Sequence, residues 1–294
     1  MPDRPFAPTP EQREAITHGL TPLFLIAGAG AGKTSVMAER ILWLVQEGTA
    51  KADEILALTF TNKAAFNLKE KVRQRLGVDA DVTVATYHSF GQMVIADHAL
   101  ELDLAPGTTL LNRAQAWQLL YSVFDELRFD RRKTLSPRIL LDDALALASR
   151  CADHLRTADE VAADCELIVK EGRWKMADKA TERLELTRVV EAYERRKRER
   201  HLIDYGDQIR LAVRLMQHHP EVAQAAREQH PVVLLDEYQD TNFAQRRLLQ
   251  LIYPPGSAVT RWSAQREARA SASSSRMRGD SVLRRSKRSS SKTL

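Results

Sequence analysis

Four short apolar runs stand out along the chain, at residues 23–27, 55–60, 82–86 and 232–235. Each is followed by polar or glycine-rich residues and then by a helical pattern. Runs of this length without internal alternation are typical of strands that are buried on both faces of a parallel sheet. The pattern therefore predicts an α/β domain with a parallel sheet.

Between the third and fourth runs the periodicity becomes that of helices. From about residue 91 to residue 230, Leu, Ala, Arg and Glu recur at three- and four-residue spacing, which is the period of one helix face. One such face carries Trp117, Leu120, Phe124 and Leu127. The stretch 181–200 is dense in charge, which favours a long helix with a solvated face. We expect an all-helical insertion at 93–200, interrupting an α/β domain formed by 1–92 and 201–260.

The net charge of +5 arises at the carboxyl end of the chain. Residues 261–294 contain ten Lys or Arg and two Asp or Glu, a net +8, so residues 1–260 carry −3. The body of the chain is not basic, and an argument for nucleic-acid binding has to come from local motifs. Residues 261–294 also contain ten serines and almost no apolar periodicity, which predicts a disordered tail.

The chain lacks the sequence features of membrane and secreted proteins. No stretch approaches the roughly 18 apolar residues of a membrane-spanning helix, and residues 1–10 have neither the basic flank nor the apolar run of a signal peptide. Cys151 and Cys165 have no CxxC spacing and no nearby His pair, so we expect reduced, structural thiols. These observations predict a cytoplasmic protein with no membrane partner.

The strongest local signal is the segment AGAGAGKT at residues 27–34, directly after the first apolar run. Its small residues would let backbone N–H groups approach the oxygens of a phosphate chain. Lys33 would bind the β- and γ-phosphates, and the Thr34 hydroxyl would bind Mg²⁺. We therefore expect ATP and Mg²⁺ to bind here, although the strict pattern begins with Gly. The predicted ATP contacts are Ala27, Gly28, Ala29, Gly30, Ala31, Gly32, Lys33, Thr34 and Ser35.

Two adjacent carboxylates, Asp236 and Glu237, end the fourth apolar run. A strand that delivers them to the carboxyl edge of the sheet would bring them to the phosphate loop. Asp236 would then hold Mg²⁺ together with Thr34, while Glu237 accepts a proton from the attacking water. Lys33, Asp236 and Glu237 are the predicted catalytic groups.

Five further segments carry motifs: TPEQREAI at 9–16, LTFTNKAA at 58–65, TYHS at 86–89, LIDYGDQ at 202–208 and DEYQDTN at 236–242. In this order they resemble the Q motif, motif Ia, the threonine-aromatic-histidine motif, a short acidic motif and motif II of the UvrD/Rep helicases of superfamily 1. The resemblance spans residues 8–259, including the helical insertion before motif II.

This resemblance implies a RecA-like P-loop domain and an ATP-dependent DNA helicase or translocase. The family couples ATP hydrolysis to movement along single-stranded DNA, and the resemblance to UvrD and Rep implies 3′ to 5′ polarity and a role in DNA repair. The implied partner is single-stranded or tailed duplex DNA, and the sequence identifies no protein partner.

The resemblance also assigns roles to individual residues. Gln12 would read the adenine edge with its amide, which offers both a donor and an acceptor. Gln239 and Asp240 would couple the nucleotide site to the DNA site. Base stacking and phosphate or sugar contacts to single-stranded DNA are implied for Phe60, Thr61, Asn62, Tyr87 and His88. Without the resemblance, the position of Phe60 favours a core residue at a strand end.

The chain departs from the family pattern in two places. Ser35 stands where many relatives have an Arg that stacks on the adenine. The family's Gly-Asp and Gln-Ser-Ile-Tyr motif, and the second RecA-like domain that supplies arginines to the γ-phosphate, cannot be found in residues 261–294. Such an arginine contributes on the order of 10³-fold or more to phosphoryl transfer. We therefore expect a fragment with weak turnover; the alternative is a non-catalytic ATP- or DNA-binding module. We expect residues 261–294 to be a frame-shifted or otherwise foreign ending, with a genuine basic tail as the alternative.

Overall fold

The computed structural model describes residues 7–28, 30–77, 80–102, 104–105, 107–127, 136–172 and 174–263. They form two compact units. The first comprises the described residues of 7–86, 228–241 and 255–263, and the second those of 87–227 and 242–254. The domain boundaries expected from the sequence, after residues 92 and 200, differ from this division and stay a prediction.

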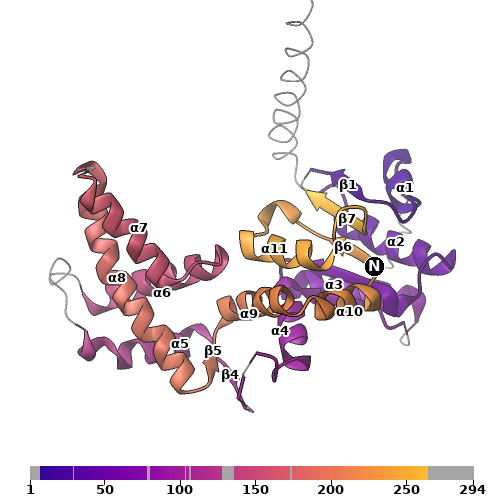
Figure 1. The fold of residues 1–294 in the computed structure, drawn as a ribbon. Coiled ribbons are helices and arrows are strands. Elements are labelled where there is room, and N and C mark those ends of the chain that lie inside the picture. Colours follow the sequence, from indigo (N-terminus) through magenta and orange to yellow (C-terminus); the bar gives the residue numbers. More distant parts are fainter. Residues whose placement is uncertain are drawn as a thin grey trace, which may run out of the picture. The chain divides into compact units, whose positions relative to one another are not determined.

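A five-stranded sheet organises the first unit (Figure 1). The strand order is β1-β7-β6-β2-β3, and every pairing is parallel. The strands are β1 (Leu23–Ile26), β2 (Ile55–Thr59), β3 (Thr83–Thr86), β6 (Val232–Leu235) and β7 (Ala258–Ser263). All carboxyl ends of the strands therefore lie at one edge of the sheet, where open α/β sheets bind their ligands. The predicted fold class, α/β with a parallel sheet, is confirmed.

Burial differs between the inner and the outer strands. β2 and β6 are buried along their whole length. In β1, Phe24 and Ile26 are 45% and 47% exposed, so the prediction of burial on both faces is wrong for this strand. The reason is its position: β1 is an edge strand among the described residues, and an edge strand has fewer neighbours to cover its side chains.

The last strand of the sheet extends beyond residue 260, where the sequence predicts the end of the domain. β7 continues through Arg261, Trp262 and Ser263, and Trp262 is only 2% exposed. In the parallel register Trp262 lies opposite Leu25, and the Ala27 N–H donates to the Ser263 carbonyl at 3.1 Å. Residues 261–263, the first three of the predicted tail, therefore belong to the sheet. Its remaining residues, 264–294, lie outside the described part of the chain.

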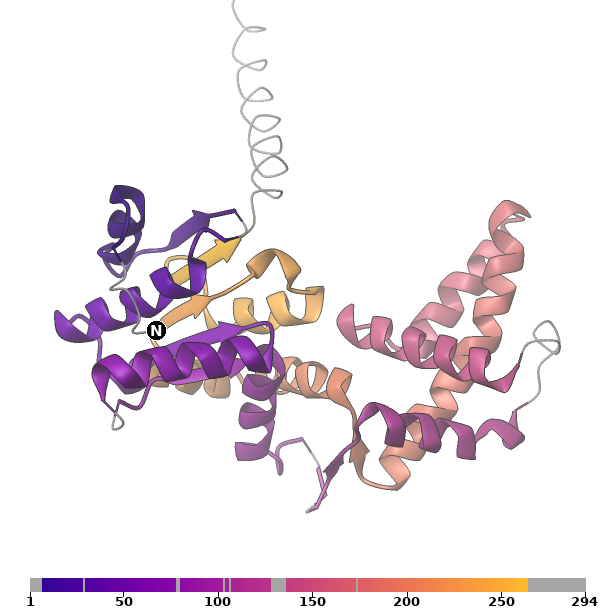
Figure 2. The ribbon, with the colours of Figure 1, turned by 180° about the vertical axis from the view of Figure 1, so that it is seen from behind.

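Helices α1 (Pro10–Ile16), α2 (Lys33–Gln46) and α3 (Asn62–Leu76) and the short helices η1 (Ala52–Glu54) and η3 (Tyr238–Asp240) complete the first unit. Thr9 and Thr61 cap α1 and α3, because each side-chain hydroxyl accepts a backbone N–H of the first turn. α3 packs against β2 and β3 (Figure 2). Buried side chains that join these helices to the sheet include Met37, Ile41, Leu44, Leu68, Leu234 and Trp262.

A buried arginine fixes the segment that contains α1. Arg40, on α2, is 1% exposed. Burial lowers the pKa of its guanidinium to about 10. Its guanidinium donates to the backbone carbonyls of Ala15, Ile16, His18 and Gly19 and to the Thr260 hydroxyl, at 2.7–3.2 Å. The end of α1 is thereby held against α2 and β7.

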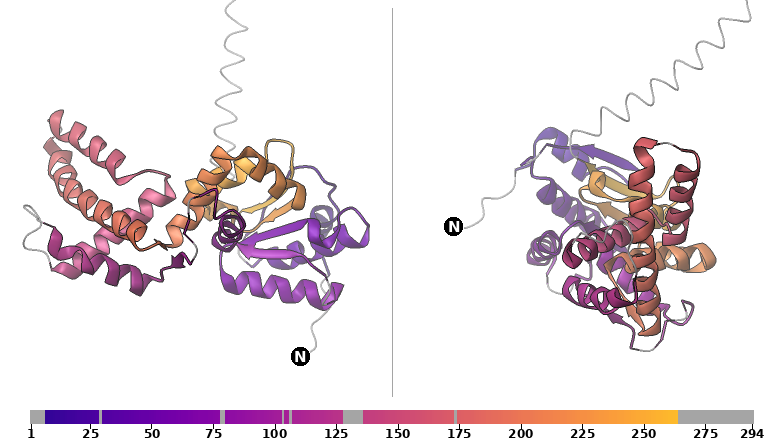
Figure 3. Two further views of the ribbon diagram at one scale, coloured as in Figure 1. Left: turned by 60° about the horizontal axis from the view of Figure 1, so that its bottom comes forward. Right: turned by 90° about the vertical axis from the view of Figure 1, so that its left-hand side faces the viewer.

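The second unit is mainly helical (Figure 3). Its elements are α4 (Tyr87–Asp97), β4 (Thr109–Leu110), α5 (Arg113–Ser122), η2 (Phe124–Glu126), α6 (Pro137–Asp153), α7 (Ala158–Lys170), α8 (Trp174–Glu199), β5 (Leu202–Ile203), α9 (Tyr205–His218), α10 (Pro220–Gln229) and α11 (Phe243–Ile252). Of the predicted apolar face, Leu120 is buried in its core, and Trp117, Phe124 and Leu127 are partly buried against that core. The last two do not belong to one helix face with the others, because α5 ends at Ser122. In the described part of the chain, no helix has the length and apolar character that crossing a membrane requires.

The charged stretch 181–200 falls mainly within the long helix α8, which has exposed residues such as Arg198 on one side and buried residues on the other. Within α8, Val189, Val190 and Tyr193 are buried in the core of the second unit. Even Lys197 is 2% exposed. Three carboxylates within 2.9 Å of its ammonium offset the burial of this charge.

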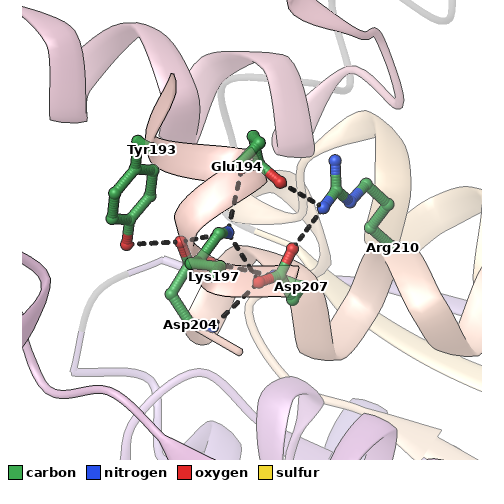
Figure 4. A network of polar contacts seen from close by, with 6 residues as sticks. All are labelled: Tyr193, Glu194, Lys197, Asp204, Asp207 and Arg210. Carbon is green, nitrogen blue, oxygen red and sulfur yellow. Dashed lines mark hydrogen bonds and ion pairs between the residues drawn. The ribbon is translucent and has the colours of Figure 1, made fainter. Parts of the chain in front are cut away.

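Lys197 lies at the centre of a buried ionic network (Figure 4). Its ammonium is 2.9 Å from Glu194, 2.8 Å from Asp204 and 2.7 Å from Asp207. Arg210 pairs with Glu194 and Asp207, and the Tyr193 hydroxyl donates to Asp204. Asp204 also caps α9. The short acidic motif at 202–208 thus forms the connection between the end of α8 and the start of α9.

Candidate functional site

The phosphate loop leads from β1 into α2 through two glycines with left-handed backbones. Gly30 has φ +77° and Gly32 φ +74°, a conformation that strongly favours glycine. The Ser35 and Val36 N–H groups donate to the Gly32 carbonyl at 2.9 and 3.0 Å, which starts α2. The first amides and the positive end of the helix dipole then face the loop, as an anion site requires. Ala29 lies outside the described residues.

Open space surrounds the backbone of the loop. A Cβ atom placed on Gly28 or Gly30 would meet no atom within 4 Å. Internal packing therefore does not require glycine at position 28, where the backbone has room to approach a phosphate chain. Ala27, Ala31 and Thr34 complete the loop and the first turn of α2.

Lys33 and Glu237 meet at the carboxyl edge of the sheet. The Lys33 ammonium lies 2.8 and 2.9 Å from the two Glu237 carboxylate oxygens, and the Gln239 side-chain amide donates to Glu237 at 2.6 Å. Burial raises the pKa of Glu237, but the hydrogen bonds from Lys33 and Gln239 outweigh it and lower the pKa. The pair therefore holds Glu237 as a carboxylate.

The backbone at Glu237 is strained. Its φ of +46° is left-handed, a region that non-glycine residues enter at a cost of order 1–3 kcal/mol and chiefly at functional sites. This conformation turns the chain directly after β6 and directs the Glu237 side chain to Lys33.

Asp236 lies one residue earlier and in a different environment. Its backbone N–H donates to the Leu58 carbonyl at 2.8 Å, and its carboxylate accepts the Glu237 N–H at 3.0 Å. Burial raises the pKa of Asp236, and the Glu237 charge raises it further. The Asp236 carboxylate and the Thr34 hydroxyl are oxygen donors of the kind that Mg²⁺ takes when phosphates supply the remaining ligands.

Gln12 contacts the phosphate loop directly. Its amide N–H donates to the Ala31 carbonyl at 3.0 Å, and its amide oxygen accepts the Thr9 N–H at 3.0 Å. Each end of the amide keeps one further donor or acceptor position, and the adenine contact of Gln12 stays a prediction. Ser35, in the position where relatives have Arg, accepts a hydrogen bond from the Lys71 ammonium of α3 at 3.2 Å.

The predicted DNA residues after β2 lie on the surface. Phe60 is 50% exposed, so the alternative of a core residue at the strand end is wrong. Thr61 uses its hydroxyl to cap α3, and Asn62 is the first residue of that helix. Their exposure leaves ring and polar groups available, while the DNA role itself stays a prediction.

Tyr87 and His88 belong to the second unit. Tyr87 is 2% exposed, which leaves its ring little surface for a base. His88 packs edge-on against Tyr205 with 6.3 Å between ring centroids. Burial lowers the pKa of His88, and the charge of Asp153 opposes this shift.

The sequence does not predict the contacts that two residues, Asp153 and Arg261, make near motif II. Asp153, the last residue of α6, accepts a hydrogen bond from the Asn242 amide at 2.6 Å. Arg261 lies over the Tyr238 ring at 5.4 Å. Neither has a local signal, because Asp153 is 89 residues from Asn242 and Arg261 stands at the start of the expected tail. Asp240 contacts Gln239 at 3.1 Å within η3.

The comparisons with known proteins agree with the motifs. Residues 8–260 match the UvrD/REP helicase N-terminal domain. The ATP-dependent DNA helicase UvrD1 of Mycobacterium leprae is 29% identical over 251 residues, which is 84% of this chain and 30% of that protein. UvrD1 of Mycobacterium tuberculosis H37Rv is 31% identical over 243 residues, covering 82% and 30%.

A third relative carries a different helicase name. The ATP-dependent DNA helicase PcrA of Leuconostoc citreum is 30% identical over 244 residues, 82% of this chain and 30% of PcrA. The chain thus spans about 30% of the length of the curated relatives it matches. With the family match over residues 8–260, the chain belongs to the UvrD/REP helicase family.

Proposed function

We propose that residues 8–260 form the nucleotide-binding wall of an ATP-dependent DNA helicase that moves 3′ to 5′ along single-stranded DNA. The observation that carries this proposal is the contact between Lys33 of the phosphate loop and Glu237 of motif II at 2.8 Å. A cation and a general base that meet at the strand ends of one sheet are the two groups that ATP hydrolysis needs from this side.

The chemistry follows from an exchange of partners. When ATP enters the loop, Lys33 leaves Glu237 for the β- and γ-phosphates. Glu237 then accepts a proton from the water that attacks the γ-phosphorus. The bond between the γ-phosphorus and the oxygen of the β-phosphate breaks, and ADP and inorganic phosphate leave. Thr34 and Asp236 would hold Mg²⁺, which supplies charge neutralisation at the phosphates when bound.

Gln239 is suited to link this site with DNA. Its amide holds Glu237 at 2.6 Å and Asp240 at 3.1 Å, so a shift of η3 would change the position of the base. We propose that single-stranded DNA on Phe60, Thr61 and Asn62 promotes such a shift. Tyr87 would contact DNA only after its buried side chain becomes accessible, whereas His88 is already partly exposed.

Nucleotide binding and turnover of the 294-residue chain test the proposal. We expect Mg-ATP binding that Lys33→Ala abolishes, and hydrolysis on the order of 10³-fold below that of an arginine-assisted site, stimulated by oligo(dT). Lys51→Ala is the matched control, because this surface lysine pairs only loosely with Glu54 at 3.9 Å. Binding without any hydrolysis would favour the non-catalytic binding module, and binding unaffected by Lys33→Ala would refute both.

The DNA contact is tested separately by Phe60→Ala. Loss of one base–aromatic stack reduces the binding free energy by about 1–3 kcal/mol. Phe66→Ala is the control, since Phe66 is 65% exposed on α3. Equal affinities of the two variants for oligo(dT) would contradict the proposed track.

A further inference from the structure

A cleft of about 430 Å³ opens in the second unit, lined by residues of α6, α7, α8 and the start of α11. The lining includes the apolar residues Leu147 and Val161. Its basic residues are Arg150, His154, Arg156 and Arg183. Among the residues that the structure describes, no carboxylate lines it. The volume is within the range of sites for single small molecules, about 300–1,000 Å³, and far below what a duplex needs.

The cations of the cleft differ in how they are held. Arg156 is fixed by Glu160 at 2.9 Å and Asp164 at 3.0 Å. Arg150 and Arg183 are exposed, and no ion pair among the described residues engages either guanidinium. Two guanidinium groups are therefore available to an anion that enters the cleft.

An aromatic ring completes the cleft. Phe243, the first residue of α11, lines it and is 49% exposed. An exposed ring beside unpaired guanidinium groups offers a stacking surface and phosphate contacts together, the combination that binds single-stranded nucleic acids. An acidic peptide would use the cations but would gain little from the ring.

We propose that this cleft, defined by Arg150, Arg183 and Phe243, binds one nucleotide of a single strand, with the base on Phe243 and the adjoining phosphates on the two arginines. The proposal rests on the proposed function in one respect, the affinity of the chain for single-stranded DNA. It adds a contact in the second unit that is separate from Phe60, Thr61 and Asn62.

The test measures binding of fluorescein-labelled oligo(dT) to the full chain by anisotropy over a range of salt concentrations. Arg150→Gln with Arg183→Gln should reduce the slope of log K against log salt by about 1.4, because each phosphate contact to a single strand contributes about 0.7. Phe243→Ala should weaken binding about tenfold at constant slope, which corresponds to roughly 1.4 kcal/mol.

Matched control variants remove an arginine charge and an aromatic ring outside the cleft. Arg198→Gln removes an exposed charge of α8 outside the cleft, and Phe66→Ala removes an exposed ring; both should leave affinity and slope unchanged. Far-UV circular dichroism and thermal unfolding verify that each variant is folded. Since all three cleft side chains are exposed, the variants should keep the unfolding temperature of the native chain.

The outcomes separate this inference from the proposed function. If Phe60→Ala weakens binding but the three cleft substitutions do not, the cleft proposal is overturned and the proposed function stands. If the native chain binds no oligo(dT), both fail. If polyglutamate binds as tightly as oligo(dT) and the arginine substitutions weaken both equally while Phe243→Ala weakens neither, the cleft is a site for acidic peptides and the nucleotide proposal is overturned.

Discussion

Replacing Glu237 by Gln tests whether the Lys33–Glu237 pair competes with the phosphates of ATP. The two side chains are 12% and 33% exposed and 2.8 Å apart, and a partly solvated pair of this kind contributes about 1 kcal/mol. Gln keeps a hydrogen-bond acceptor but loses the charge, so Lys33 becomes available at lower cost. Since 1.4 kcal/mol corresponds to tenfold, nucleotide affinity should rise about fivefold while hydrolysis is lost.

The assay is titration of the full chain with a fluorescent, non-hydrolysable ATP analogue in the presence of Mg²⁺. Glu39→Gln is the matched control, because Glu39 pairs with Arg75 at 3.1 Å on the surface of the same unit. An affinity for the analogue that is unchanged or lower in Glu237→Gln, relative to this control, would refute the idea that the pair must open before ATP binds.

Four further outcomes follow from the structure. Trp262→Ala should reduce the free energy of unfolding by about 3–5 kcal/mol in urea titrations, and a loss below about 1 kcal/mol would exclude residue 262 from the core. Asp153→Asn should lower the pKa of His88 in an NMR titration, because the Asp153 charge raises it; a higher pKa would contradict this. Lys71→Ala should weaken Mg-ATP binding severalfold if its ammonium, beside Ser35, faces the nucleotide, and equal affinity would exclude that role. The pKa of Glu237 is lowered from 4.5, so its pair with Lys33 stabilises the fold above pH 4.5 and this stabilisation is lost as the pH falls further. Below pH 4.5, the free energy of unfolding in urea should therefore depend less steeply on pH for Glu237→Gln than for the native chain.

The sequence alone predicts those parts of the fold whose signals are local. The strands β2 and β6 are continuous apolar runs because both of their faces are buried, and the phosphate loop is readable because its glycines and Lys33 are contiguous. The partnership of Lys33 with Glu237 follows from the parallel sheet, since both strands end at the same edge. For these features, the spacing of residues along the chain determines the geometry.

Other features depend on contacts between distant segments, which periodicity does not record. Trp262 reads as part of a serine- and arginine-rich tail, yet its position opposite Leu25 in the sheet buries it. Tyr87 has the motif of an exposed DNA contact and is buried in the structure. Arg40 looks like an ordinary charge on an amphipathic helix, and only the chain reversal after α1 brings four carbonyl groups to its guanidinium.

The ionic network around Lys197 has a mechanical consequence for the second unit. Bending α8 away from α9 would have to separate Lys197 from carboxylates in a nearly dry environment, and breaking such a buried pair typically costs 3–5 kcal/mol. The junction between the end of α8 and the start of α9 is therefore expected to resist bending.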